Sequence, residues 1–139
     1  MGRERHGAEA AVGVRVPADH RHLTMLRGIT ETALLLAEFA LDEVTDLQVA
    51  IDEVVTGLVD AAIDGSTIAC DLTVDRGRVA VCVSGTAGTR DVIDRNGLGW
   101  HVIRTITGTP IANIGGFDIM SGGYPVSVEF VRETGDRSR

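Results

Sequence analysis

Residues 47–62 read Leu-Gln-Val-Ala-Ile-Asp-Glu-Val-Val-Thr-Gly-Leu-Val-Asp-Ala-Ala, and this stretch decides the fold class. Its apolar positions keep the spacing of an amphipathic helix with one buried stripe, made of Leu47, Ile51, Val54, Leu58 and Ala62. Asp46, Glu53 and Asp60, seven residues apart, follow another side. Gly57 stands one turn after Glu53. A glycine inside a helix costs about 1 kcal/mol relative to alanine, which suggests that this position makes no use of a side chain.

The segment before this helix predicts a short strand and a first helix. Residues 12–16 alternate as a strand. Pro17 and Asp19 then open a helix that is predicted to end near Leu41. Its apolar positions keep helical spacing at Leu23, Leu26, Ile29, Ala33 and Leu34. Asp42 or Thr45 is the expected cap of the second helix.

The segment after the helix predicts a hairpin with two reduced cysteines. Two alternating runs, 68–74 and 79–83, flank Asp75-Arg76-Gly77-Arg78. Matching their apolar faces across a two-residue turn pairs Cys70 with Val83 and Leu72 with Val81. Cys82 then points to the opposite face, so we expect two free thiols, with Cys70 in the core.

The rest of the chain predicts a loop, a third helix and two more strands. The loop covers residues 84–97, the helix about 98–106, and the strands 111–119 and 126–131, around a turn at 121–125. The resulting order predicts an α+β fold, a two-layer sandwich of a mostly antiparallel sheet covered on one face by helices. We expect one domain over residues 12–132, with loose tails at 1–11 and 133–139.

Composition excludes several classes of function. The net charge of −7 and the pI near 4.9 disfavour nucleic acid and suit a basic protein partner, although the charge also serves solubility. No apolar run approaches the roughly 20 residues that cross a bilayer. The charged start has no signal-peptide core, so we expect a cytoplasmic protein without a membrane contact.

Three segments together resemble the histidine-kinase-like (GHKL) ATPase fold, also called the Bergerat fold. Residues 47–62 resemble its N box, residues 81–88 (Val-Cys-Val-Ser-Gly-Thr-Ala-Gly) stand where it has a first glycine box, and residues 96–103 (Asn-Gly-Leu-Gly-Trp-His-Val-Ile) resemble the second. Their order and spacing are most similar to the small anti-sigma factor serine kinases of the RsbW and SpoIIAB type. The Trp-His pair resembles actinobacterial members.

The resemblance assigns roles that this chain fills only in part. Glu53 matches the glutamate that polarises the attacking hydroxyl, but Gly57 stands at the asparagine that helps to hold Mg²⁺. Ser84 stands at the position of the aspartate that binds the adenine amino group in the family, and Thr86 stands at the position of the glycine that follows it. The remaining nucleotide-binding candidates are Gly88, Gly97 and Gly99, the last two preceding a helix whose N–H groups are able to receive phosphate.

These losses predict no cofactor, or only weak binding of ATP or ADP with Mg²⁺. A lost charged acceptor forfeits about 1.5–3 kcal/mol. If the lost metal ligand costs a similar amount, the affinity for the nucleotide falls by about two to four decades. Phosphoryl transfer depends on positioning and on the metal, so little kinase activity is expected and Glu53 is alternatively a solvated or partner-facing carboxylate. An active kinase would need compensating ligands, such as Ser84 or Thr86 for the base and Thr56 or Asp60 near the metal.

Other polar residues carry weaker signals. Arg90 and Arg95 would meet phosphate or an acidic partner, or form a solvated lid. No metal site is predicted, because His20 and His22 lack a cluster of further ligands and His101 is typical of a packed histidine. We hypothesise that Trp100 fills space that adenine would otherwise occupy.

The resemblance implies a cytoplasmic anti-sigma factor. Such a protein sequesters an alternative sigma factor, is released by an anti-anti-sigma antagonist of the STAS type, and forms a homodimer. The acidic outer side of the first two helices and the loop region is the expected contact surface. The alternatives are an active Mg-ATP-dependent serine kinase that phosphorylates its antagonist, and a degenerate domain with a scaffolding role.

Overall fold

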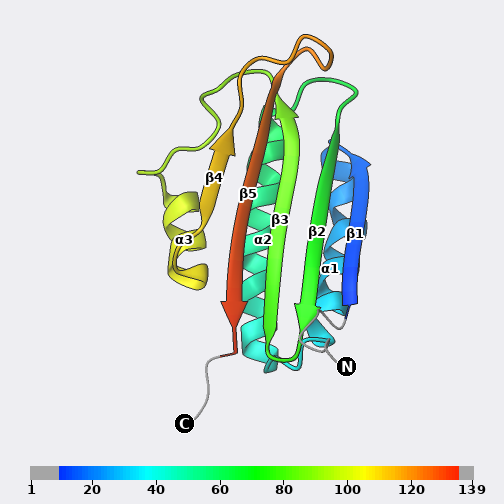
Figure 1. Ribbon diagram of the computed structural model, residues 1–139, viewed down its shortest axis with the longest axis vertical. Helices are drawn as coiled ribbons and strands as arrows, with labels where there is room; N and C mark the ends of the chain where they lie inside the picture. Colours follow the sequence, from blue (N-terminus) through cyan, green and yellow to red (C-terminus); the bar gives the residue numbers. More distant parts are fainter. Residues whose placement is uncertain (1–9, 135–139) are drawn as a thin grey trace, which may run out of the picture.

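A computed structural model describes residues 10–134 and confirms the α+β sandwich (Figure 1). Five antiparallel strands form one sheet in the order β1-β2-β3-β5-β4. The strands are β1 (Ala10–Pro17), β2 (Thr67–Asp75), β3 (Arg78–Ala87), β4 (Ile111–Ile114) and β5 (Tyr124–Glu133). The helices are the 3-10 turn η2 (His20–His22), α1 (Leu23–Leu35), α2 (Leu41–Ala61) and α3 (Leu98–Thr107). The expected tails lie outside the described residues except at their inner ends.

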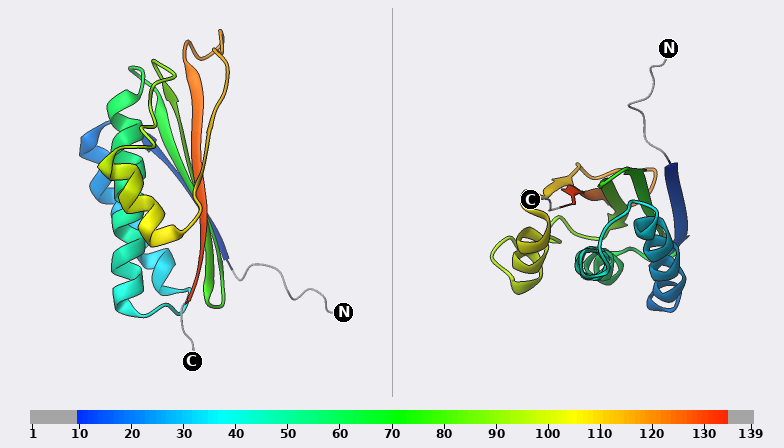
Figure 2. Two further views of the ribbon diagram at one scale, coloured as in Figure 1. Left: turned by 90° about the vertical axis from the view of Figure 1, so that its left-hand side faces the viewer. Right: turned by 90° about the horizontal axis from the view of Figure 1, so that it is seen from below.

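The three helices form one layer over one face of the sheet. Figure 2 shows α2 in the middle of this layer, α1 on the side of β1, and α3 on the side of β4. The 21-residue α2 buries Leu47, Ile51, Val54 and Leu58 of the predicted stripe, and also Val44, Ala50, Val55 and Val59. The predicted stripe is wrong at Ala62, which follows the last residue of the helix and is half-buried. Full burial of an aliphatic side chain contributes about 1.5–3 kcal/mol. The core of the molecule therefore lies between α2 and the sheet.

The predicted hairpin is confirmed in its register. Cys70 pairs with Val83 and Leu72 with Val81, and Gly77 closes the turn with a φ of +70°. Both cysteines are free thiols. Burial raises the pKa of Cys70 to about 12. Partial burial also raises the pKa of Cys82, and the neighbouring carboxylates Glu129 and Asp71 raise it further.

The predicted end of the first helix is wrong, and so is the predicted cap of the second. The first helix ends at Leu35, because the chain turns to bury Ala37 and Phe39 and passes through a positive φ of 64° at Glu38. The second helix begins at Leu41, before Asp42 and Thr45. The Glu43 carboxylate accepts the Ala40 N–H at 3.0 Å. The side chain of Glu43, inside the first turn, thus pairs with the backbone of the N-cap residue Ala40, whose own side chain accepts no hydrogen bond.

The strand predicted over residues 111–119 is shorter, since β4 ends at Ile114. The ladder with β5 ends at the pair of Ile114 with Val126, and the next residue of β5 is Pro125, which has no N–H to donate. A Cβ on Gly115 would stand 2.7 Å from Cγ of Pro125, so the chain passes too closely for a side chain. The segment beyond Ile114 becomes a protruding loop that exposes Ile119 and Met120.

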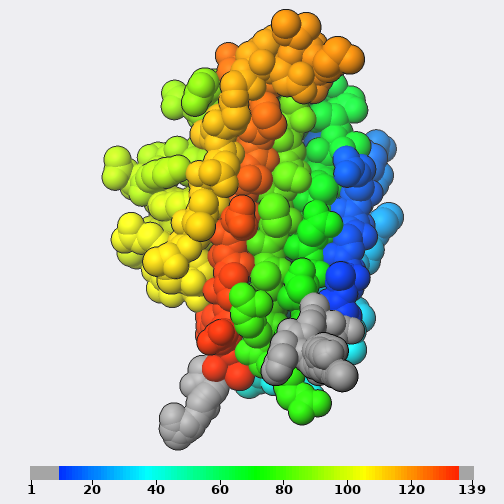
Figure 3. Space-filling view, viewed as in Figure 1, coloured from blue at the N-terminus to red at the C-terminus, as the bar shows by residue number. Residues whose placement is uncertain are grey.

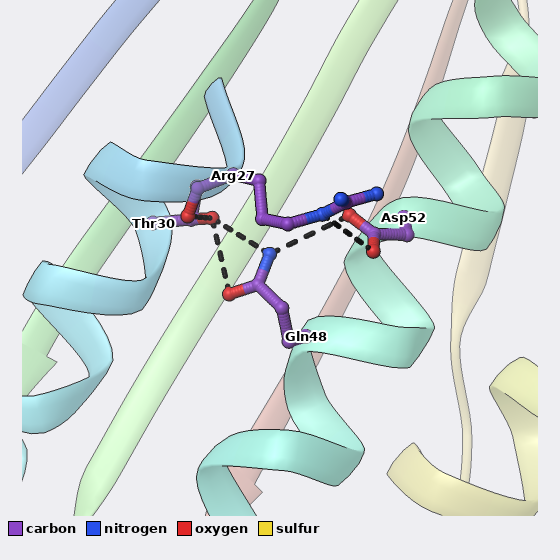
Figure 4. Close-up of polar contacts among 4 residues, drawn as sticks. All are labelled: Arg27, Thr30, Gln48 and Asp52. Carbon is purple, nitrogen blue, oxygen red and sulfur yellow. Dashed lines mark hydrogen bonds and ion pairs between the residues drawn. The ribbon is translucent and has the colours of Figure 1, made fainter. Parts of the chain in front are cut away.

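Polar side chains join α1 to α2 (Figure 4). Arg27 Nε donates to Asp52 Oδ2 at 3.0 Å. Gln48 Nε2 donates to the hydroxyl of Thr30 at 3.0 Å, and Thr30 is completely buried. Gln48 thus links the buried hydroxyl to the ion pair, because its Nε2 is also 3.5 Å from Asp52 Oδ1. This network fixes how the two helices lie against each other.

None of the described helices lies over the other face of the sheet (Figure 2), where the space-filling view shows the strands side by side (Figure 3). Its side chains are mixed, with Asp71, Cys82 and Glu129 beside the exposed Ile111 and Val131. None of the described helices is long and apolar enough to cross a membrane.

Candidate functional site: a pocket between α2 and α3

A pocket of about 280 Å³ lies between α2, α3 and the loop that precedes α3. From α2 it is lined by Glu53 and Gly57, with Val54 and Leu58. The loop and α3 contribute Val92, Ile93, Asp94, Gly97, Gly99, Trp100 and Ile103, and Val128 lines it from β5. The second helix therefore presents Glu53 to a cavity, whereas Asp46 and Asp60, which the spacing placed on the same side, do not line it.

Two glycines at the start of α3 lie close to carboxylate side chains. Gly97 is the N-cap, and its N–H donates to the carbonyl of Asp94 at 3.0 Å. A Cβ on Gly97 would stand 2.9 Å from Oδ2 of Asp94, and one on Gly99 would stand 3.1 Å from Oε2 of Glu53. The Asp94 carboxylate also accepts the N–H of Asn96 at 3.1 Å. The two glycines thus let the loop and α2 approach the first turn of α3.

The Glu53 carboxylate lies beside the first turn of α3, where the resemblance expects a phosphate group. The free N–H groups and the dipole of a helix N-terminus stabilise an anion there. Glu53 is half-buried and makes no hydrogen bond or ion pair with any other described residue. An incoming phosphate would therefore have to displace, or lie against, a carboxylate of the protein itself.

Two of the predicted binding residues lie outside this pocket. In β3, Val83 is buried under the helices, and a Cβ on Gly85 would meet Leu58 and Ile68. Because side chains alternate along a strand, Ser84 between them points to the opposite face of the sheet. Gly88 lies next to Ile63, beyond the end of β3, and is not among the residues that line the pocket.

The side chains named as compensating ligands are also directed elsewhere. Thr56 lies on the α1 side of α2, in a small crevice with Arg27 and Asp52. The carboxylate of Asp60 is 2.8 Å from Nε2 of His20. Among the described residues no group of three or more His, Cys, Asp or Glu side chains is placed to hold a metal ion.

The charge of the pocket is acidic. Glu53 and Asp94 are its ionisable lining side chains, and no arginine lines it in the described chain. Arg95 instead lies over the Trp100 ring, with its guanidinium carbon 5.6 Å from the ring centroid, and Arg90 is exposed. Trp100 itself is 8% exposed and forms part of the wall. This lining suits apolar or cationic groups and repels polyphosphate.

The apolar residues of the loop before α3 were not among the predicted site residues. Val92 and Ile93 are half-buried against the core although they lie in a loop of polar and small residues. The signal was present, because two adjacent branched apolar residues inside a polar loop indicate a segment that folds back onto the domain.

Comparisons with known proteins agree with the motifs. No protein-family model matches the chain. The anti-sigma-F factor RsbW of Mycobacterium tuberculosis is 30% identical over 96 residues, in strains CDC 1551 / Oshkosh and ATCC 25618 / H37Rv alike. The match covers 69% of this chain and 57% of the relatives, so the chain spans little more than half of their length. The resemblance to the RsbW type of anti-sigma factor is thereby confirmed.

Proposed function

We propose that this chain, which is related in sequence to the RsbW-type anti-sigma factors, sequesters a sigma factor by direct contact. The observation that carries the proposal is the 30% identity to an anti-sigma-F factor over 69% of the chain. The relative's name points to a sigma factor of the F type as the first candidate partner. An anti-anti-sigma protein of the STAS type would release the sigma factor by competing for this chain.

The surface that suits such a partner is the connection between α1 and α2. We define the leucine corner as Leu35, Leu36 and Leu41, which are 50%, 57% and 74% exposed. The carboxylates of Glu38 and Asp42 are exposed beside them. Apolar groups rimmed by charge are typical of protein interfaces. The partner segment would then be apolar and basic, which the net charge of −7 also favours.

We propose further that nucleotide binding and kinase chemistry are weakened or lost. Gly57 offers no oxygen to Mg²⁺, and the two ionisable side chains that line the pocket are both carboxylates. Ser84, at the expected adenine contact, points away from the pocket. Switching between partners would then rest on binding alone, in a cytoplasmic homodimer.

A pair of charge variants tests the sigma-binding proposal. Leu36→Lys places a cation at the leucine corner, and Ile111→Lys places one at a site of equal exposure on β4, 57% against 55%. We expect Leu36→Lys to weaken binding to the host's F-type sigma factor more than tenfold and Ile111→Lys to leave it unchanged. Isothermal titration measures both. Failure of the unaltered chain to bind any sigma factor of its host would favour the scaffolding alternative.

A thermal shift with saturating Mg-ATP tests the nucleotide proposal. A ligand at about 100 times its Kd adds about 2.7 kcal/mol, which corresponds to roughly 5–10 °C for a small domain. We expect no shift for the native chain, and a shift for Gly57→Asn if the metal ligand alone was missing. A clear shift in the native chain, followed by label transfer to a STAS protein, would establish the kinase instead.

A further inference from the structure

We propose that the pocket between α2 and α3 binds a small organic cation, an amine or amidine carried on an apolar or aromatic body. This proposal concerns a different part of the molecule from the leucine corner and does not depend on sigma binding. It is carried by three features of the pocket, which are its charge, its walls and its shape.

The charge of the pocket selects for a cation. Glu53 and Asp94 supply two carboxylates, and no basic side chain of the described chain lines the cavity. Glu53 has no hydrogen-bond or ion-pair partner among the described residues, and the exposed carboxylate of Asp94 accepts a hydrogen bond from the backbone N–H of Asn96 but pairs with no described cationic side chain. A carboxylate at the mouth of an apolar cavity interacts with a cation through a lower dielectric than water. An ammonium or amidinium group would be attracted there and an anion repelled.

The walls of the pocket select for an apolar body. Beyond the two carboxylates and two glycines of α3, the lining consists of aliphatic side chains, Gly57 and Trp100. The Trp100 ring already holds the Arg95 guanidinium at 5.6 Å, which is the contact distance of a cation–π pair. Arg95 does not line the pocket, and its charge opposes that of a bound cation.

The size of the pocket limits the ligand to a small one. A volume of 280 Å³ is just below the usual range of ligand pockets, about 300–1,000 Å³. Gly57 lines the pocket at an exposed position of α2, and a Cβ built there would meet no atom within 4 Å. This position therefore accepts a larger side chain without a clash, and such a side chain would occupy the space of the ligand.

The fluorescence of Trp100 measures binding directly, because the chain has a single tryptophan. Three probes share a phenyl ring and a two-carbon arm and differ in charge, namely phenethylammonium, 2-phenylethanol and phenylacetate. We expect phenethylammonium to bind about tenfold more tightly than the alcohol, as two partly screened carboxylates would give, and phenylacetate to bind least. Equal affinity for the three probes, or the tightest binding for phenylacetate or Mg-ATP, would overturn the proposal.

Charge variants with opposite expected signs exclude a merely structural effect. Glu53→Gln should weaken phenethylammonium binding about threefold to tenfold, and Arg95→Gln should strengthen it. Asp46→Asn is the matched control, because it removes the same charge from an exposed position of α2, seven residues from Glu53. If Asp46→Asn weakens binding as much as Glu53→Gln does, general attraction to an acidic protein explains the result and the site is rejected.

A steric pair locates the site. Gly57→Leu and Gly28→Leu both fill open space on a helix, since a Cβ at either glycine meets no atom within 4 Å. Gly57 lines the pocket and Gly28 does not. We expect Gly57→Leu to abolish binding of phenethylammonium and Gly28→Leu to preserve it, with both variants folded by circular dichroism. Binding that survives in Gly57→Leu would place the ligand elsewhere and contradict the proposal.

Discussion

The two sides of α2 are built differently. Toward α1, a connected polar network links Arg27, Thr30, Gln48 and Asp52, and the crevice there measures about 10 Å³. Toward α3, the cavity measures about 280 Å³, and the Glu53 carboxylate at its edge has no polar partner among the described residues. Asp52 and Glu53 are adjacent in the sequence and yet belong to these two different sides.

This difference separates what holds the fold from what is left open for a ligand. Buried polar groups are normally paired, because leaving one unpaired costs about 1–3 kcal/mol. On the α1 side the fully buried hydroxyl of Thr30 follows this rule. On the α3 side, packing that served stability alone would fill the space, since protein interiors are close-packed. The open cavity with its carboxylates is therefore where we place the binding function, and the α1 side is where we place rigidity.

Truncation of Trp100 should have the largest effect. Trp100→Ala removes the main apolar anchor between α3 and the rest of the molecule, and loss of a buried aromatic costs about 3–5 kcal/mol. We expect about 3 kcal/mol, because one side of the ring already borders the cavity. Urea unfolding followed by circular dichroism measures this loss. Amide exchange should accelerate in α3 and not in α1.

The matched control for Trp100 lies in the same helix. Leu98 is 79% exposed, so Leu98→Ala should change the free energy of unfolding by less than about 0.5 kcal/mol. A loss below 1 kcal/mol for Trp100→Ala would mean that α3 is held by other contacts. The contrast between the two sides of α2 would then lose its basis.

Removal of the Thr30 hydroxyl should have the next largest effect. Thr30→Val keeps the shape of this fully buried side chain but removes the hydroxyl that accepts from the half-buried amide of Gln48 at 3.0 Å, which leaves that amide only the longer contact with Asp52 at 3.5 Å. We expect a loss of about 1–2 kcal/mol in urea unfolding. Thr107→Val is the control, because that hydroxyl donates only to Ile103 O within its own helix, and its loss should cost about 0.5 kcal/mol or less. Equal losses would show that the network adds nothing beyond one local hydrogen bond.

The sequence predicted the parts of the fold that local patterns determine. The hairpin register followed from two alternating runs and a turn with glycine, because a slip by one residue would turn every apolar side chain outward. The buried stripe of α2 followed from its spacing. These patterns involve neighbours in the chain, so they needed no knowledge of the third dimension.

The sequence predicted the site only in part, because the rest depends on how distant segments meet. The spacing placed Glu53 on a separate face of α2, and the glycines of α3 were identified, but whether they bind a nucleotide stays a prediction. The orientation of Ser84 depends on which face of β3 the helices cover, and there Gly85 is the residue that points inward. The end of α1 depends on burial of Ala37 and Phe39, which no helical periodicity indicates.

The smallest expected effect is the coupling energy between Arg27 and each of two adjacent carboxylates, Asp52 and Glu53. Arg27 and Asp52 are 52% and 35% exposed at the side chain, so solvent screens their ion pair. A double-mutant cycle with Arg27→Met and Asp52→Asn should give a coupling of about 0.3–0.8 kcal/mol. The parallel cycle with Glu53→Gln should give zero within error, since Glu53 faces the α3 side although it follows Asp52 directly. Both cycles use urea unfolding at low salt and again at 0.5 M NaCl, where the first coupling should shrink. Equal couplings in the two cycles would mean that Arg27 senses the general acidity of α2 and not one partner. In that case the polar groups on the α1 side of α2 would be no better paired than Glu53 on the α3 side. An unpaired carboxylate would then no longer distinguish the cavity from the rest of the helix surface.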